Sequence, residues 1–63
     1  MTTIFKTEVA GYEIKLHQVT PRSFCVIYGE QVSTGLTYSQ AAQELGECIM
    51  HALACEGKFE IRE

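Results

Sequence analysis

The sequence predicts a small α+β protein, in which a three-stranded antiparallel sheet in β-β-β-α order carries one helix packed on one face. Three observations lead to this fold class. Two neighbouring segments alternate between apolar and polar residues, a third is rich in β-branched and aromatic residues, and a long helical pattern follows with clear start and stop signals. The 63 residues suffice for a single domain, residues 1–63.

The first two strands are predicted over residues 3–9 and 12–19, because both segments alternate with period two. Ala10 and Gly11 lie between them and suit a two-residue hairpin turn. This turn length sets a register with three pairs on one face of the sheet: Val9 with Tyr12, Thr7 with Ile14, and Phe5 with Leu16.

The third strand is predicted over residues 23–28, after a break at Pro21. Its residues are apolar on both faces, and in a three-stranded meander it would form an exposed edge that invites aggregation. Two elements are candidates to cover this edge: a short C-terminal strand over residues 59–61, or a second copy of the chain. Residues 29–35 are expected to form a connection, with Val32 extending the third strand.

The helix is predicted to begin at Tyr38 and to end at a glycine cap at Gly57. Thr37 and Gln40 match a capping box, in which each side chain bonds the backbone of the other residue. At about 100° per residue, seven residues share the face expected to cover the sheet: Tyr38, Ala41, Ala42, Leu45, Cys48, Ile49 and Ala52.

The second half of this helix keeps apolar residues outside the core-facing stripe, and Gly46 lies beside them. Single exposed apolar residues are ordinary on soluble proteins, but a cluster on so short a chain favours a binding surface. We therefore expect a non-catalytic protein-interaction or regulatory protein, a homodimer that acts by binding another protein. The expected partner-binding residues lie on the helix and on the third strand: Met50, Leu53, Ala54, Gly46, Cys25 and Ile27.

Sites of chemistry receive little support from the sequence. Cys48, His51 and Cys55 share one side of the helix, and with Cys25 they are candidates for a zinc site in a zinc- or thiol-dependent protein. However, ligands on one continuous helix converge poorly on a tetrahedral ion, and no Cys-x2-Cys pair is present. The sequence shows no third group to orient a nucleophile and its base. We expect no enzyme activity, no bound metal and no cofactor.

The charge pattern argues against several partners. The net charge is −3, and the five basic residues are scattered rather than clustered, which disfavours direct nucleic-acid binding. The sequence has neither a bilayer-spanning apolar run nor a signal peptide, so no membrane association is expected. Three cysteines at irregular spacing fit a reducing compartment, so a cytoplasmic location is expected.

The step into the helix resembles part of a known family. Gly35, Thr37 and Ala41 match the Gly-x-Thr-x-x-Glu-Ala step of the N-terminal β-β-β-α module of HicB-like antitoxins, with Gln40 in place of the glutamate. The resemblance covers about 20 residues. It implies the same element order, and it implies an antitoxin-type module that neutralises a partner protein.

Overall fold

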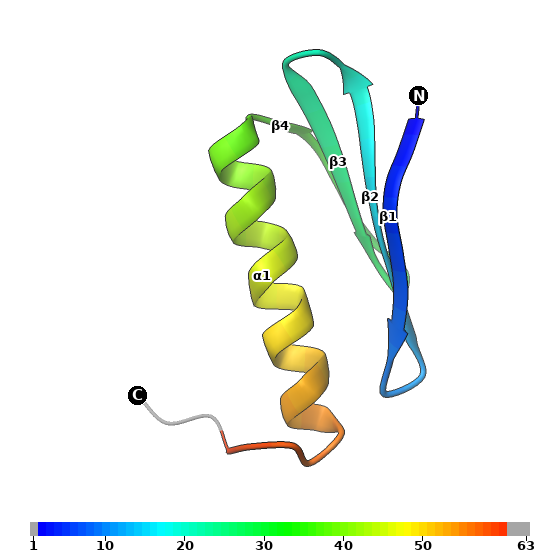
Figure 1. The fold of residues 1–63 in the computed structure, drawn as a ribbon, viewed down its shortest axis with the longest axis vertical. Helices are drawn as coiled ribbons and strands as arrows, with labels where there is room; N and C mark the ends of the chain where they lie inside the picture. The colour runs from blue at the N-terminus through cyan, green and yellow to red at the C-terminus, as the bar shows by residue number, and fades with distance from the viewer. Residues whose placement is uncertain (1, 61–63) are drawn as a thin grey trace.

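A computed structural model describes residues 2–60 and shows a four-stranded antiparallel sheet followed by one helix (Figure 1). The strands lie in chain order, and each pairs with the next along the chain. The elements are β1 (Thr2–Val9), β2 (Tyr12–Thr20), β3 (Ser23–Tyr28), β4 (Gln31–Leu36) and α1 (Tyr38–Cys55). The α+β class and a helix on one face are as predicted, but the predicted count of three strands is wrong.

The β1–β2 hairpin has the predicted register. Val9 pairs with Tyr12, and the pairing continues through Phe5 and Leu16. Ala10 has a φ of 54°, followed by Gly11 at 80°. Two positive φ angles are typical of the turn whose twist matches that of the flanking strands. The left-handed Ala10 is held in place from a distant part of the chain, since its N–H donates a 2.9 Å hydrogen bond to the Glu56 carboxylate.

The strand that the sequence did not predict is β4, which occupies most of the predicted connection over residues 29–35. Gly29 and Glu30 form a two-residue turn, and Tyr28 pairs with Gln31 across it. The pattern of β4 is hard to recognise because only Val32 and Leu36 are strongly apolar in its six residues, and Gly35 interrupts it.

With β4 in place, β3 lies between two strands, so its apolar residues are not at an exposed edge of the sheet. The edge of β3 is therefore covered by β4, and neither of the two predicted covers is needed. Phe59 and Glu60 are not in a strand, and the rest of the predicted C-terminal strand, Ile61, lies outside the described residues.

Both ends of α1 have the predicted caps. The Gln40 N–H donates to the Thr37 hydroxyl at 3.2 Å, and the Thr37 N–H donates to the Gln40 side chain at 3.0 Å. At the C-terminus the N–H of Lys58 reaches the carbonyl of Leu53, while Gly57 takes a φ of 84°. This left-handed residue makes a Schellman-type stop, in which glycine meets no penalty from a Cβ.

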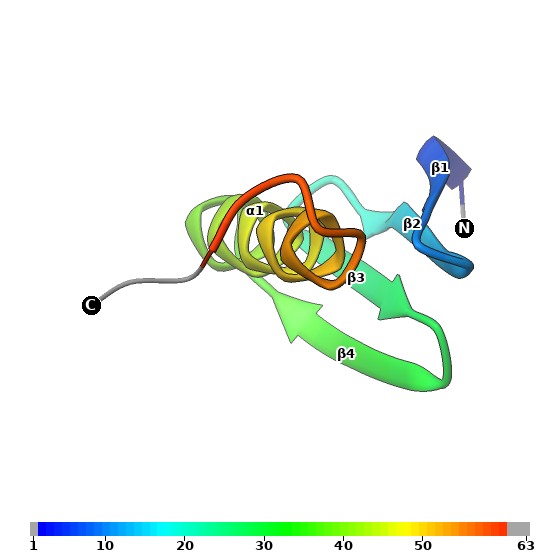
Figure 2. The same cartoon turned by 90° about the horizontal axis from the view of Figure 1, so that it is seen from below.

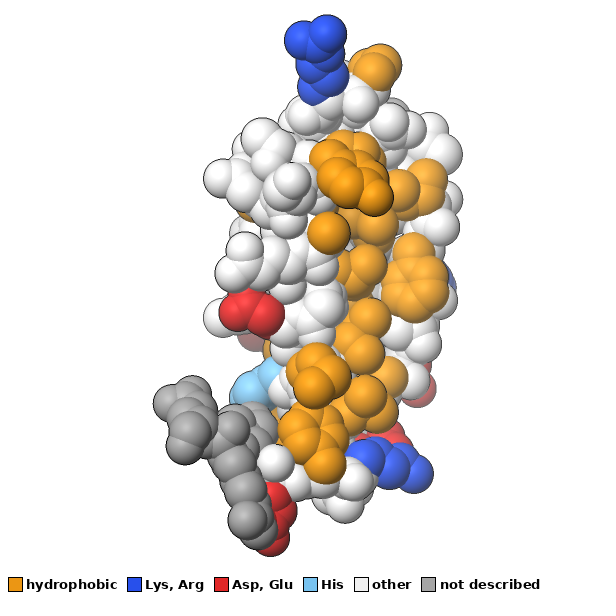
Figure 3. All heavy atoms as spheres, turned by 60° about the vertical axis from the view of Figure 1, so that its left-hand side comes forward, with side chains coloured by type: hydrophobic (Ala, Val, Ile, Leu, Met, Phe, Trp, Pro, Cys, Tyr) orange, Lys and Arg blue, Asp and Glu red, His pale blue; other side chains and the backbone are white. Residues whose placement is uncertain are grey.

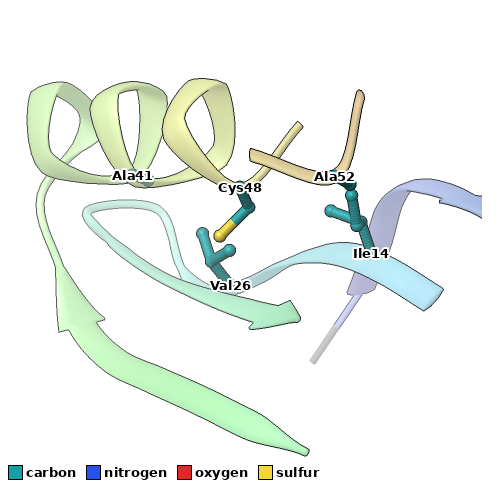
Figure 4. Close-up of a cluster of buried hydrophobic side chains, with 5 residues drawn as sticks. All are labelled: Ile14, Val26, Ala41, Cys48 and Ala52. Atoms are coloured by element: carbon teal, nitrogen blue, oxygen red, sulfur yellow. The ribbon is translucent and has the colours of Figure 1, made fainter. Parts of the chain in front are cut away.

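The core lies between α1 and the face of β2 and β3 that the helix covers (Figure 2). Figure 4 shows its five buried side chains: Ile14, Val26, Ala41, Cys48 and Ala52. Ile14 and Val26 are the largest fully buried side chains among the described residues. The small side chains of α1 let the helix lie close to the sheet, so a small core closes with few large residues.

The predicted core stripe of the helix is only partly buried. Ala41, Cys48 and Ala52 are buried, whereas Leu45 and Ile49 are half-buried and pack at the margin of the core. Tyr38 is 77% exposed, and Ala42 is also exposed, so both were wrongly expected in the core. The stripe is wider than the surface that one sheet can cover, and α1 is turned so that one of its flanks faces outward.

Candidate interaction surface

An extended exposed apolar surface lies along one side of α1. Figure 3 shows hydrophobic side chains in a nearly continuous band along this side of the molecule. At about 100° per residue, six partly or largely exposed residues of α1 lie there, together with Gly46. Two residues of β1 lie beside the N-terminal half of the band. The surface, here named the apolar flank, consists of Ile4, Phe5, Tyr38, Ala42, Leu45, Ile49, Met50 and Leu53.

A bulge in β1 brings Ile4 onto this surface. The register shifts between Thr3 and Phe5, so Ile4 is an extra residue in the strand. A bulge changes the direction in which neighbouring side chains point, and Ile4 lies beside Leu16 and Tyr38 at the edge of the helix. Ile4 is 49% exposed and Phe5 is 41% exposed. Sequence alternation misses this contribution, because a regular strand would place Ile4 on the opposite face of the sheet.

The N-terminal half of the flank contains a groove. A hollow of about 240 Å³ lies between β1, β2, β3 and the first two turns of α1. Its lining is entirely uncharged: Ile4, Leu16, Phe24, Tyr38, Ala41, Ala42 and Leu45. In the C-terminal half, Met50 is 54% exposed and shares this side of the helix with the half-buried Ile49 and Leu53, and these three residues are here named the ridge. The flank therefore has a hollow and a ridge on the same helix.

Gly46 lies midway between the groove and the ridge. No other part of the described chain comes within 4 Å of the point where a Cβ would stand, so no close contact within the chain requires glycine here. Glycine inside a helix costs about 1 kcal/mol of stability relative to alanine. Close packing within a single chain therefore does not explain Gly46.

The predicted partner-binding residues fall on two separate surfaces. Met50 and Leu53 belong to the apolar flank with Gly46 beside them, while Ala54 lies at its margin and is half-buried. On β3, Val26 points toward the helix. Cys25 and Ile27 therefore point to the other face of the sheet, since side chains alternate along a strand. Cys25 is only 5% exposed, so it offers little surface to a partner.

The four candidate zinc ligands do not lie together in the structure. Cys48 is buried between α1 and the sheet, whereas Cys25 lies across the sheet from it. Cys55 is exposed, and its sulfur lies 3.8 Å from Nδ1 of His51. Among residues 2–60, no group of three or more His, Cys, Asp or Glu side chains is placed to hold a metal ion.

The opposite flank of α1, next to β4, is polar. The Tyr28 hydroxyl lies 2.9 Å from Nδ1 of His51, and the two rings meet edge to face. Burial raises the pKa of Tyr28 above its ordinary value, which disfavours ionisation of its hydroxyl. Ser33 donates to Glu44 on the same side. These bonds attach α1 to the β3–β4 hairpin.

The three thiols are expected to react very differently. Burial, and secondarily the nearby Glu44 and Glu47, raise the pKa of Cys48, so little reactive thiolate forms there. Cys25 is buried, and Cys55 is exposed. Titration of the native protein with a disulfide reagent should give one fast thiol, Cys55. The other two should react only as fast as the fold opens.

The same titration in concentrated guanidinium chloride is the control, in which all three thiols should react at similar rates. A Cys55→Ser variant should lose the fast phase and keep the slow one. Rapid reaction of two thiols in the native protein would contradict the burial of Cys48 or Cys25.

Comparison with protein-family models, with curated proteins and with solved structures found no match. The HicB-like interpretation therefore stays a prediction based on the residues at the helix start. Within residues 2–60, no helix combines the length and apolarity that crossing a membrane would require.

Proposed function

We propose that this is a non-catalytic interaction protein that binds another protein through its apolar flank. The observation that carries the proposal is the exposure of large apolar side chains along one side of a chain of only 63 residues, led by Tyr38 and Met50. The largest contiguous apolar patch on a protein surface is often a functional site. Aromatic residues and methionine are also enriched at interfaces between proteins.

The absence of charge on the flank supports a protein partner. The chain carries a net charge of −3, yet no member of the flank is ionisable at neutral pH. The central part of protein interfaces is similarly depleted of charged residues. The acidic residues of α1, Glu44 and Glu47, lie on the polar flank instead, where they line the hollow beside Tyr28 and His51.

The arrangement of polar groups favours binding over catalysis. The pair formed by Cys55 and His51 is long, at 3.8 Å, and the bond to Tyr28 already engages Nδ1 of the imidazole. Nucleophilic catalysis requires a base held within hydrogen-bond reach and oriented by a third group.

A charge placed on the flank should abolish binding. Ala42 is exposed at the rim of the groove, so Ala42→Glu puts a carboxylate in the interface without disturbing the core. We expect the immobilised variant to capture at least tenfold less partner protein from a lysate of the cells that express it, measured by quantitative mass spectrometry against the original chain.

Thr34→Glu is the matched control, because Thr34 is exposed on β4, the strand farthest from β1 in the sheet, and the substitution adds the same charge. This variant should capture the same proteins as the original chain. Equal capture by the original chain and by Ala42→Glu would contradict the proposed role of the flank.

A further inference from the structure

We infer that the occupant of the apolar flank is a second copy of this chain, with the two α1 helices antiparallel and crossing at Gly46. The inference rests on the proposed function, because it names the partner of the same surface. It starts from the position of Gly46, which is eight residues from Tyr38 at one end of α1 and nine from Cys55 at the other. Gly46 thus lies at the middle of the helix.

A two-fold axis through Gly46 matches large residues with small ones. In an antiparallel pair, residues equally distant from the axis on opposite sides face each other. Four residues from the centre, about 6 Å along the axis, Ala42 of one copy faces Met50 of the other. Eight residues from the centre, Tyr38 faces Ala54. Met50 of each copy therefore lies at the rim of the other's groove, while Ile49 and Leu53, three and seven residues from the centre, face Gln43 and Ser39.

In this arrangement, the open space at Gly46 accommodates the second helix. Two helices approach most closely where they cross, and the side chains there set the distance between their axes. A glycine at the crossing point, where a Cβ would meet nothing within 4 Å beyond its chain neighbours and the backbone of its own helix, leaves that space for the second helix. The helix propensity lost at Gly46 is then offset by contacts between the chains.

The area and the charge of the flank suit a modest homodimer. With about 200 Å² for each large side chain, the exposed fractions of the flank correspond to roughly 500 Å² per copy. A standard interface takes about 800 Å² from each partner, so the dimer should be weak and concentration-dependent. Two acidic chains can meet here because their carboxylates Glu44 and Glu47 lie on the opposite flank.

Substitutions at Gly46 give effects of opposite sign on folding and on association. Gly46→Ala should raise the melting temperature of dilute monomer, because alanine is the better helix former and has open space. The same methyl group separates the two helices, so the dimer dissociation constant should rise at least tenfold, measured by sedimentation equilibrium. Glu47→Ala, one residue along and on the polar flank, should change that constant less than about threefold.

Crosslinking tests the geometry directly. In a Cys55→Ser background, Gly46→Cys should weaken the reversible dimer as Gly46→Ala does, but mild oxidation of concentrated protein should trap the remaining dimer as a disulfide, because the two introduced thiols meet at the crossing point. Glu47→Cys in the same background should remain monomeric under denaturing electrophoresis. A chain that stays monomeric at the highest soluble concentration would overturn the inference, as would a dimer unaffected by Gly46→Leu.

These results are separate from the test of the proposed function. A monomeric chain that still captures a different protein, in a manner sensitive to Ala42→Glu, would overturn the homodimer and leave the flank as a binding surface. A dimer that resists Gly46→Leu and captures nothing through the flank would contradict both.

Discussion

Replacing Ile14 by alanine is expected to lower the free energy of unfolding by about 2–5 kcal/mol, the usual cost of removing a large aliphatic side chain from a core. Ile14 is fully buried, and it is one of only two large side chains in residues 2–60 with no appreciable exposure. It also pairs with Tyr28 on β3 and lies against Ala52 of the helix. Its removal therefore leaves a cavity where the sheet and the helix meet.

The loss is large relative to the stability of so short a chain. At about 0.05–0.15 kcal/mol per residue, a domain of this size is stable by a few kcal/mol. Ile14→Ala should therefore leave a substantial unfolded population at room temperature. Urea denaturation followed by circular dichroism, at a concentration low enough to keep the chain monomeric, measures the change.

Val32→Ala is the matched control, because Val32 is also a β-branched residue in a strand but is 59% exposed. Its cost should stay below about 1 kcal/mol, the span of strand propensities. If the two variants lost equal stability, Ile14 would not be at the centre of the core, and the contact between α1 and β2 would have to be placed elsewhere.

The local signals in the sequence predicted the structure well where they were strong. The capping box at Thr37, the glycine stop at Gly57 and the two-residue turn at Ala10 all depend on a few neighbouring residues. The register of the first hairpin followed from the turn length, because a shift of one residue would move Ile14 to the other face. The structure confirms each of these predictions.

The fourth strand was missed because its residues carry little local signal. In β4, Val32 is mostly exposed and Ser33 faces the polar side of α1, where it bonds Glu44. An edge strand with one solvated face needs few apolar residues. The better indication was indirect, since a strand as apolar as β3 would be an aggregation hazard at an exposed edge, and a fourth strand removes that edge.

The candidate surface was predicted in part. Met50 and Leu53 were identified from their position on the helix, and both lie on the apolar flank. Tyr38 and Ala42 were assigned to the core, because periodicity shows that residues share a face but not how far the sheet covers it. The contribution of Ile4 depends on a bulge, which has no clear signature in one sequence.

A second large loss of stability is expected from a substitution at Ala52, whose side chain lies against Ile14 in the core. Ala52 is fully buried, and its methyl group faces the Ile14 side chain in the core. Ala52→Leu would insert three carbon atoms at this contact and force the helix away from the sheet. Overpacking of this kind costs about 1–3 kcal/mol, measured by thermal denaturation of dilute protein.

Ala54→Leu separates packing from helix propensity, since it makes the same substitution two residues further along. Ala54 is only half-buried and lies outside the buried cluster, so this variant should keep nearly the original stability. If the Ala52→Leu variant were as stable as the original chain, the helix could move away from the sheet at no cost in free energy. The small side chains of α1 would then not be what holds the helix close, and the outward turn of the apolar flank would need a different cause.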